Sequence, residues 1–181
     1  MATDTDTVVQ DTIAALPEER PDWLDGAVEV ELSTRHLRAK WDADILDVDD
    51  KNKHDTIIER KDEFLVRFRV YLEGRVWKCI AGCWCFDVCF TAIGDGEDFN
   101  LSDKLPEAEK EKLFIRDWKG CDGLCIEKCV TVPCDIIPVE FCGTLYDVGC
   151  KFELRCCGCC DTPESHLAVA GHEPQGEYMF V

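Results

Sequence analysis

Apolar and polar residues alternate along much of this chain, and the clearest example is the segment 64–72. Apolar side chains occupy its even positions, whereas Arg67 and Arg69 occupy two of the odd ones. Successive side chains of a β-strand point to opposite faces of the sheet. The pattern therefore predicts a strand with one face in the core and one face toward water. The segments 76–90 and 143–156 contain similar stretches, and Gly82 predicts a bulge or bend in the first of them.

These three segments supply the core that the sequence predicts. Their apolar residues fall on one face of each strand, opposite to charged or cysteine side chains. We expect burial between two sheets for Phe64, Val66, Phe68, Val70, Trp84, Phe86, Val88, Tyr146, Val148, Phe152 and Leu154.

Further strands are predicted at 27–32, 36–50, 56–58, 124–132 and 176–181. Many short strands with turn residues between them, and no regular alternation of strand and helix, are typical of a β-sandwich. The order of strands over 27–181 resembles an immunoglobulin-like fold. That resemblance implies an all-β, antiparallel, immunoglobulin-like β-sandwich and carries no functional residue with it.

One helix is expected at most, in the segment 102–116. Pro106 is compatible with a first helical turn, and Glu107 and Glu109 favour a helix amino end. The alternative is a charged loop that leads into a strand at 112–118. The polar residues 1–25 are expected to form an amino-terminal arm, and residues 26–181 the sandwich domain.

The negative charge of the chain limits the classes of molecule that it is expected to bind. The 181 residues include 20 Lys and Arg but 38 Asp and Glu, for a formal net charge of −18. DNA, RNA and anionic membranes repel such a chain unless a basic patch is present, and the sequence contains none. We therefore expect no nucleic-acid partner. No apolar run approaches the roughly 18 residues of a spanning helix, so no membrane span is expected either.

Cysteine is the unusual component of the sequence. All 14 cysteines fall in the second half of the chain or just before it, between residues 79 and 160. A domain of this length has enough core to fold without disulfides, so the cysteines suggest a further role. The disulfide candidates are Cys79, Cys83, Cys85, Cys89, Cys121, Cys125, Cys129, Cys134, Cys142, Cys150, Cys156, Cys157, Cys159 and Cys160.

Three interpretations of these cysteines stay open. Cys83, Cys85 and Cys89 share the face opposite the aromatic residues, which favours a network of disulfides between segments, for example between 79–89 and 121–134. A thiolate metal site formed by Cys156, Cys157, Cys159 and Cys160 is the alternative, because thiolates bind soft metals. Reduced cysteines that serve as small strand residues are the third.

The sequence contains no motif for catalysis. A nucleophilic cysteine enzyme needs one thiol with a lowered pKa rather than fourteen cysteines, and no cofactor is predicted. We expect a non-enzymatic structural subunit of an extracellular or surface assembly, such as a filament or coat, that associates with itself and is stabilised by disulfides. The alternative function is thiolate metal binding, with a cytoplasmic location if the thiols are reduced or metal-bound. The first ten residues do not read as a secretory signal, which leaves the route of export open.

Overall fold

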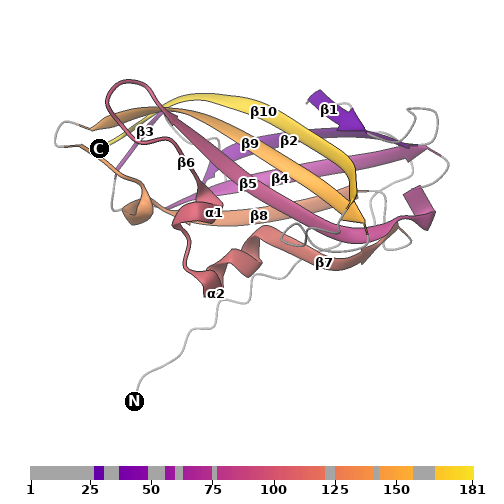
Figure 1. Ribbon diagram of the computed structural model, residues 1–181. Helices are drawn as coiled ribbons and strands as arrows, with labels where there is room; N and C mark the ends of the chain where they lie inside the picture. Colours follow the sequence, from indigo (N-terminus) through magenta and orange to yellow (C-terminus); the bar gives the residue numbers. More distant parts are fainter. Residues whose placement is uncertain are drawn as a thin grey trace, which may run out of the picture.

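Two β-sheets packed face to face form the protein in the computed structural model (Figure 1). The structure describes residues 27–30, 37–48, 56–59, 63–74, 77–120, 125–140, 143–156 and 166–181. The predicted arm, 1–25, lies outside the described residues. The all-β prediction is confirmed, with a sandwich of two sheets and a few short helices. The immunoglobulin-like order of strands stays a prediction.

The larger sheet, sheet A, contains seven strands. Its main order is β1, β10, β9, β5 and β6, with β3 beside β10 and β7 beside β5. All pairs are antiparallel except β3 with β10. The strands are β1 (Ala27–Val30), β3 (Ile57–Ile58), β5 (Ala81–Ala92), β6 (Phe99–Asn100), β7 (Phe114–Lys119), β9 (Thr144–Cys156) and β10 (His166–Phe180).

The smaller sheet, sheet B, contains three antiparallel strands in the order β2, β4 and β8. These are β2 (Leu37–Asp47), β4 (Glu63–Gly74) and β8 (Cys125–Pro133). In Figure 1, sheet B lies behind β5, β9 and β10. The described residues also include three short 3₁₀ helices: η1 (Trp77–Cys79), η2 (Glu111–Leu113) and η4 (Cys134–Ile136).

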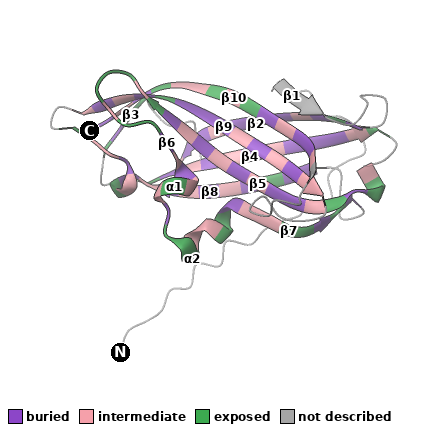
Figure 2. Ribbon diagram, in the orientation of Figure 1, coloured by how far each residue is buried: buried purple, intermediate pink, exposed green. Residues whose placement is uncertain are grey.

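The predicted core is confirmed for all of its residues, each of which is at most 1% exposed. Figure 2 shows how buried and more exposed residues alternate along β4, β5 and β9. Aromatic rings join the two sheets: Phe68 of β4 lies 5.1 Å from Phe86 of β5, and Trp41 of β2 lies 4.8 Å from Phe152 of β9. The face that each strand buries was therefore correctly assigned.

The expected single helix is replaced by two helices of four residues, α1 (Leu101–Lys104) and α2 (Glu107–Lys110), followed by η2 and then β7. Pro106 is the reason for the break, since proline has no amide hydrogen and disfavours helical backbone at the residue before it. Leu105 has accordingly an extended backbone. Both alternatives for 102–116 were partly correct, because a strand does begin at Phe114.

Two predicted strands have different limits in the structure. The strand expected from residue 76 starts at Ala81, after η1, and the bulge predicted at Gly82 is present against β7. The strand expected at 176–181 is the end of β10, which starts ten residues earlier, at His166. Gly171, Pro174 and Gly176 interrupt the sequence pattern there, and the pairing of β10 with β9 shifts between Pro174 and Gly176.

Candidate functional site

The described cysteines are distributed over several environments rather than gathered in one place. Cys134 and Cys150 belong to the core between the sheets, whereas Cys79 is exposed on η1. Cys85 is disulfide-bonded. Free thiols are present at Cys79, Cys89, Cys125 and Cys150. The cysteines at 121, 142, 157, 159 and 160 lie outside the described residues.

Cysteines of β5 and β8 face opposite sides of the sandwich. Cys85 and Cys89 are half-buried on the outward face of sheet A, and Cys129 is half-buried on the outward face of sheet B. A disulfide requires Cα atoms within about 7 Å, so Cys89 and Cys129 of one chain cannot form one. The pairing expected between 79–89 and 121–134 is therefore not formed by these two residues. Cys83, expected on an outer face, is 1% exposed, and its thiol donates to the Trp84 carbonyl at 3.7 Å.

Burial keeps several thiols protonated at neutral pH. It raises the pKa of Cys125 to about 11, with a smaller contribution from Glu127. Burial likewise raises the pKa of Cys150, and that of Cys89 in spite of the nearby Lys151 ammonium. Thiolates, not thiols, act as nucleophiles and metal ligands. These three residues are therefore poorly suited to either chemistry.

No group of three or more Cys, His, Asp or Glu side chains in the described part of the chain is arranged to hold a metal ion. Of the four cysteines in the metal hypothesis, Cys156 ends β9 and is half-buried. The other three lie outside the described residues, so this hypothesis stays a prediction.

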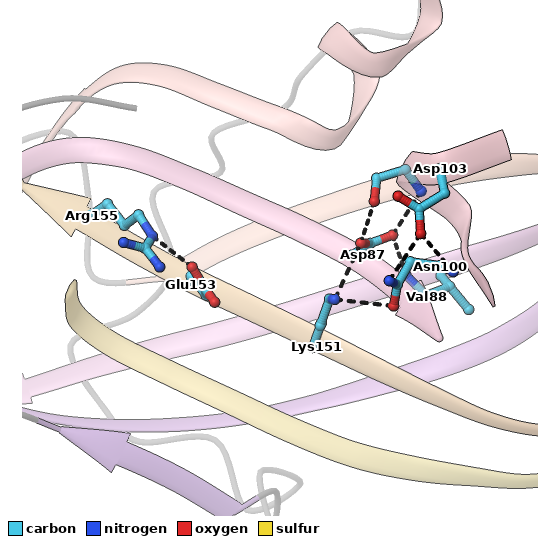
Figure 3. Close-up of polar contacts among 8 residues, drawn as sticks. Asp87, Val88, Asn100, Asp103, Lys151, Glu153 and Arg155 are labelled. Atoms are coloured by element: carbon cyan, nitrogen blue, oxygen red, sulfur yellow. Dashed lines mark hydrogen bonds and ion pairs between the residues drawn. The ribbon is translucent and has the colours of Figure 1, made fainter. Parts of the chain in front are cut away.

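A polar cluster on the outward face of sheet A is centred on Asp87 of β5 (Figure 3). Its carboxylate accepts hydrogen bonds from the Ser102 hydroxyl at 2.7 Å, the Ser102 amide at 3.0 Å and the Val88 amide at 2.9 Å. The Lys151 ammonium of β9 lies 3.4 Å from the same carboxylate. Four donors thus surround one carboxylate whose side chain is 13% exposed.

The same cluster continues into the start of α1. Lys151 also donates to the Asn100 side-chain oxygen at 3.1 Å, and Asp103 accepts from the Asn100 amide at 3.3 Å. These contacts tie α1 to β5 and β9. Through these neighbours, the Asp87 carboxylate anchors α1 to the outward face of sheet A.

A hollow of about 190 Å³ adjoins this cluster, lined by Cys85, Phe86, Asp87, Ser102, Leu113, Phe114, Lys151, Phe152 and Glu153. Sites for small organic ligands usually enclose about 300–1,000 Å³. Glu153 is already paired with Arg155 at 2.6 Å. The hollow is small and its charged groups have partners, so it does not define a ligand site.

The outward face of sheet B carries ion pairs between neighbouring strands. Arg69 of β4 is paired with Asp42 and Asp44 of β2, and Arg67 lies 2.7 Å from Asp44. In the β2–β4 register, Asp42 is opposite Arg69 and Asp44 is opposite Arg67, whereas Arg69 reaches Asp44 diagonally. Opposite charges at these positions favour this register of β2 on β4.

The two edge strands of sheet B, β2 and β8, have different neighbours. The β2 side is closed, because β1 and β10 of sheet A pack against β2. Along β8, β4 is the main neighbour in the described part of the chain, and no second strand pairs with β8 there. In sheet A, the short strands β1, β3, β6 and β7 lie beside the long strands. In the described part of the chain, β8 is therefore an edge strand that pairs with β4 alone.

Comparisons with known proteins show little similarity. No protein-family model matches the chain, and no curated protein matches it. Among solved structures, the crystal structure of the C-terminal domain of wzt is similar over 92% of this chain and 82% of that one, with 11% identity and a TM-score of 0.47. No functional residue follows from a likeness at this level. The described residues contain no helix long and apolar enough to cross a membrane.

Sequence reasoning missed the Asp87 cluster. The outward-facing positions of Asp87 and Lys151 were evident from the alternating pattern. Their proximity depends on the pairing of β5 with β9, in which Asp87 is opposite Lys151. A sequence pattern gives the face of a residue, but not the strand that lies beside it.

Proposed function

We propose that this protein is a non-enzymatic structural subunit that associates with copies of itself in an extracellular or surface assembly. The observation that supports the proposal best is the position of β8 at the end of sheet B, where it pairs with β4 alone in the described part of the chain. An unpaired edge presents backbone N–H and C=O groups that a strand of another chain can bind. Folded proteins usually cover such edges, as this chain does for the long strands of sheet A.

Charge opposes association at low ionic strength. Two copies that each carry a formal net charge of −18 repel one another. Salt screens this repulsion, with a Debye length of about 10 Å at 0.1 M and about 3 Å at 1 M. Backbone pairing between strands is much less sensitive to salt, so assembly is expected to strengthen as salt increases.

Disulfides add covalent stability in this proposal. Cys85 already forms a disulfide, and the exposed Cys79 is accessible to a neighbouring subunit. The extracellular location belongs to the same proposal, because disulfides persist in oxidising compartments.

Sedimentation velocity of the full chain, over a range of protein and salt concentrations and with or without reductant, tests the proposal. We expect oligomers whose proportion rises with salt and with protein concentration. A version without residues 1–25 shows whether the arm contributes. A monomer under every condition, in both versions, would contradict the proposal.

The metal-binding alternative is tested by intact mass under native, non-reducing conditions. A bound zinc or copper ion adds its mass, whereas each disulfide removes two hydrogens. Bound metal that is lost when Cys156, Cys157, Cys159 and Cys160 are all replaced by serine would favour the alternative over the disulfide network.

A further inference from the structure

We infer that a basic, amphipathic α-helix of a different protein binds to the outward face of sheet A, at the end of the sandwich where β3 and the last residues of β10 lie (Figure 1). The first observation is a row of apolar side chains that crosses this end of the sheet. The row consists of Ile93, Leu145, Met179 and Ile57. This inference goes beyond the proposed self-association, because the partner is not a second copy.

The pairing of the strands places the four residues of the apolar row side by side. Met179 of β10 is opposite Leu145 of β9 on one side and Ile57 of β3 on the other. The amide of Ile93, one residue after β5, donates to the Leu145 carbonyl at 2.8 Å. Because side chains alternate along a strand, the residues next to the row face the core, and each is at most 1% exposed: Ile58, Tyr146 and Phe180.

Water contacts the apolar row directly. Ile57 is 61% exposed and Ile93 is 46% exposed, and the two residues between them are half-buried. Val181 is 45% exposed and lies beside β3, since its amide donates to the Ile58 carbonyl at 3.0 Å. A single exposed apolar residue is common on protein surfaces, whereas adjacent ones are typical of a contact site for another protein.

The spacing of the apolar row fits a helix that lies across the strands. Neighbouring strands are about 4.8 Å apart, so the row repeats at about that distance and spans about 14 Å. Successive turns of an α-helix repeat at about 5.4 Å, whereas residues on one face of a strand are about 7 Å apart. Three turns of an amphipathic helix, with apolar residues three or four positions apart, therefore match the row.

Two carboxylates border the apolar row. Asp147 and Glu177 are both exposed, and they are opposite each other in the pairing of β9 with β10. They lie two residues along the strands from Leu145 and Met179, on the same outward face. Like charges directly opposite each other destabilise a sheet. A lysine or arginine of a partner would relieve this repulsion, which favours a basic helix.

Negative charge extends around this end of the sandwich. Burial raises the pKa of Tyr146, and the nearby carboxylates of Glu97, Glu140 and Asp98 raise it further. A second copy carries the same carboxylates and a formal net charge of −18, so it is repelled from this site. Lysine or arginine beside the apolar stripe of a helix complements both features of the site.

A synthetic, fluorescently labelled peptide tests the apolar part of the site. The peptide has leucine at every third or fourth position, lysine beside the leucines and alanine elsewhere, and fluorescence anisotropy at low salt gives its dissociation constant with the full chain. Ile57→Thr combined with Ile93→Thr should raise this constant by about 5- to 30-fold, because less apolar area leaves water on binding. Val48→Thr, at an exposed residue next to β2 of sheet B, is the control.

The same peptide tests the carboxylates. Asp147→Asn combined with Glu177→Gln should raise the dissociation constant by about 2- to 30-fold, through the loss of two exposed ion pairs. Glu107→Gln combined with Glu127→Gln removes the same charge from exposed residues of α2 and β8 and is the matched control. Thermal melting confirms that all variants remain folded.

Two further peptides test the nature of the partner. A peptide with glutamate in place of lysine should bind more weakly, because its charge has the sign of the site. A peptide with a central proline, which breaks the helix, should also bind more weakly. Equal binding of the proline peptide would overturn the helical form of the partner, and equal binding of the glutamate peptide would overturn its basic character.

The outcomes separate this inference from the proposed self-association. Binding that weakens with the Ile57/Ile93 and Asp147/Glu177 variants, and not with their controls, would confirm the site. No binding to the natural chain, or equal weakening by variants and controls, would overturn the site and leave the self-association standing. If the Ile57/Ile93 variant no longer forms the oligomers of the natural chain in sedimentation velocity, the row binds a second copy, and the different partner is overturned.

Discussion

Trp41 of β2 packs directly against Gly171 of β10, across the interface between the two sheets. A Cβ atom placed on Gly171 would lie 2.6 Å from Nε1 of Trp41, and it would also collide with the ring of Phe152. Glycine therefore lets the indole ring, which is fully buried, lie directly against the backbone of β10. This contact holds β2 of sheet B close to β10 of sheet A.

Gly171→Ala is expected to destabilise the fold, because the added methyl group has no space between Trp41 and Phe152. Overpacking of this kind costs about 1–3 kcal/mol. Urea denaturation followed by tryptophan fluorescence measures the change. Ala170→Ser adds one atom at the neighbouring, half-buried position and serves as the control. If Gly171→Ala is as stable as the natural chain, the two sheets can move apart at Gly171 and make room for the methyl group, which would contradict this prediction.

Phe68→Ala and Arg67→Ala test which face of β4 is buried. Phe68 is fully buried and packs on Phe86, so its truncation should cost about 3–5 kcal/mol. Arg67 is on the opposite face, with 29% of its side chain exposed, and pairs with Asp44. A partly exposed ion pair contributes about 1 kcal/mol or less. Denaturation midpoints that fall equally for the two variants would contradict this assignment of faces.

Asp87→Ala is expected to release α1 from sheet A, because the carboxylate accepts both donors of Ser102. Hydrogen–deuterium exchange should increase in residues 101–113, whereas the central residues of β4 should keep their protection. Ser102→Ala removes only the hydroxyl and should produce a smaller increase. Glu97→Ala, which removes the exposed partner of Lys104, is the control for loss of a surface carboxylate. Unchanged exchange in Asp87→Ala would show that the apolar contacts of Leu101 and Leu105 hold this segment alone.

Alkylation of thiols should distinguish Cys125 from Cys79. Cys125 is 4% exposed and its pKa is raised to about 11 by burial, whereas Cys79 is exposed. Iodoacetamide at pH 8 should therefore modify Cys79 first, as read by mass spectrometry of peptides. Similar rates at the two residues would contradict the burial of Cys125, and denatured protein supplies the reference rate for each peptide.

The raised pKa of Cys125 also predicts a direction of pH dependence. An unfolded cysteine has a pKa of about 8.5, so below that pH the thiol is protonated in both states. Above it, ionisation favours the unfolded chain until the pH passes the folded value of about 11. The stabilising effect of the protonated thiol is thus complete below about pH 8.5 and is lost as pH rises through 11. Cys125→Ser should show a smaller loss of stability over this range.

The sequence by itself determined the type of fold and the face that each strand buries. Alternation with a period of two is a local property, and the burial of apolar side chains enforces it, so residues such as Phe64 and Tyr146 could be assigned to the core directly. Net charge is likewise read directly from the sequence, because it is a sum over residues, and the absence of a nucleic-acid partner stays a prediction from it. The split of the expected helix at Pro106 shows that even local structure depends on single residues.

Only the tertiary structure decided which strands are neighbours. The meeting of Asp87 with Lys151 requires the register of β5 on β9, and the pairing of Arg69 with Asp42 requires that of β4 on β2. The separation of Cys89 from Cys129 follows from the assignment of β5 and β8 to different sheets. The contact of Trp41 with Gly171 requires that β2 of one sheet lie against β10 of the other. Such relations join residues far apart in the chain, and no local pattern encodes which of several similar strands will pair.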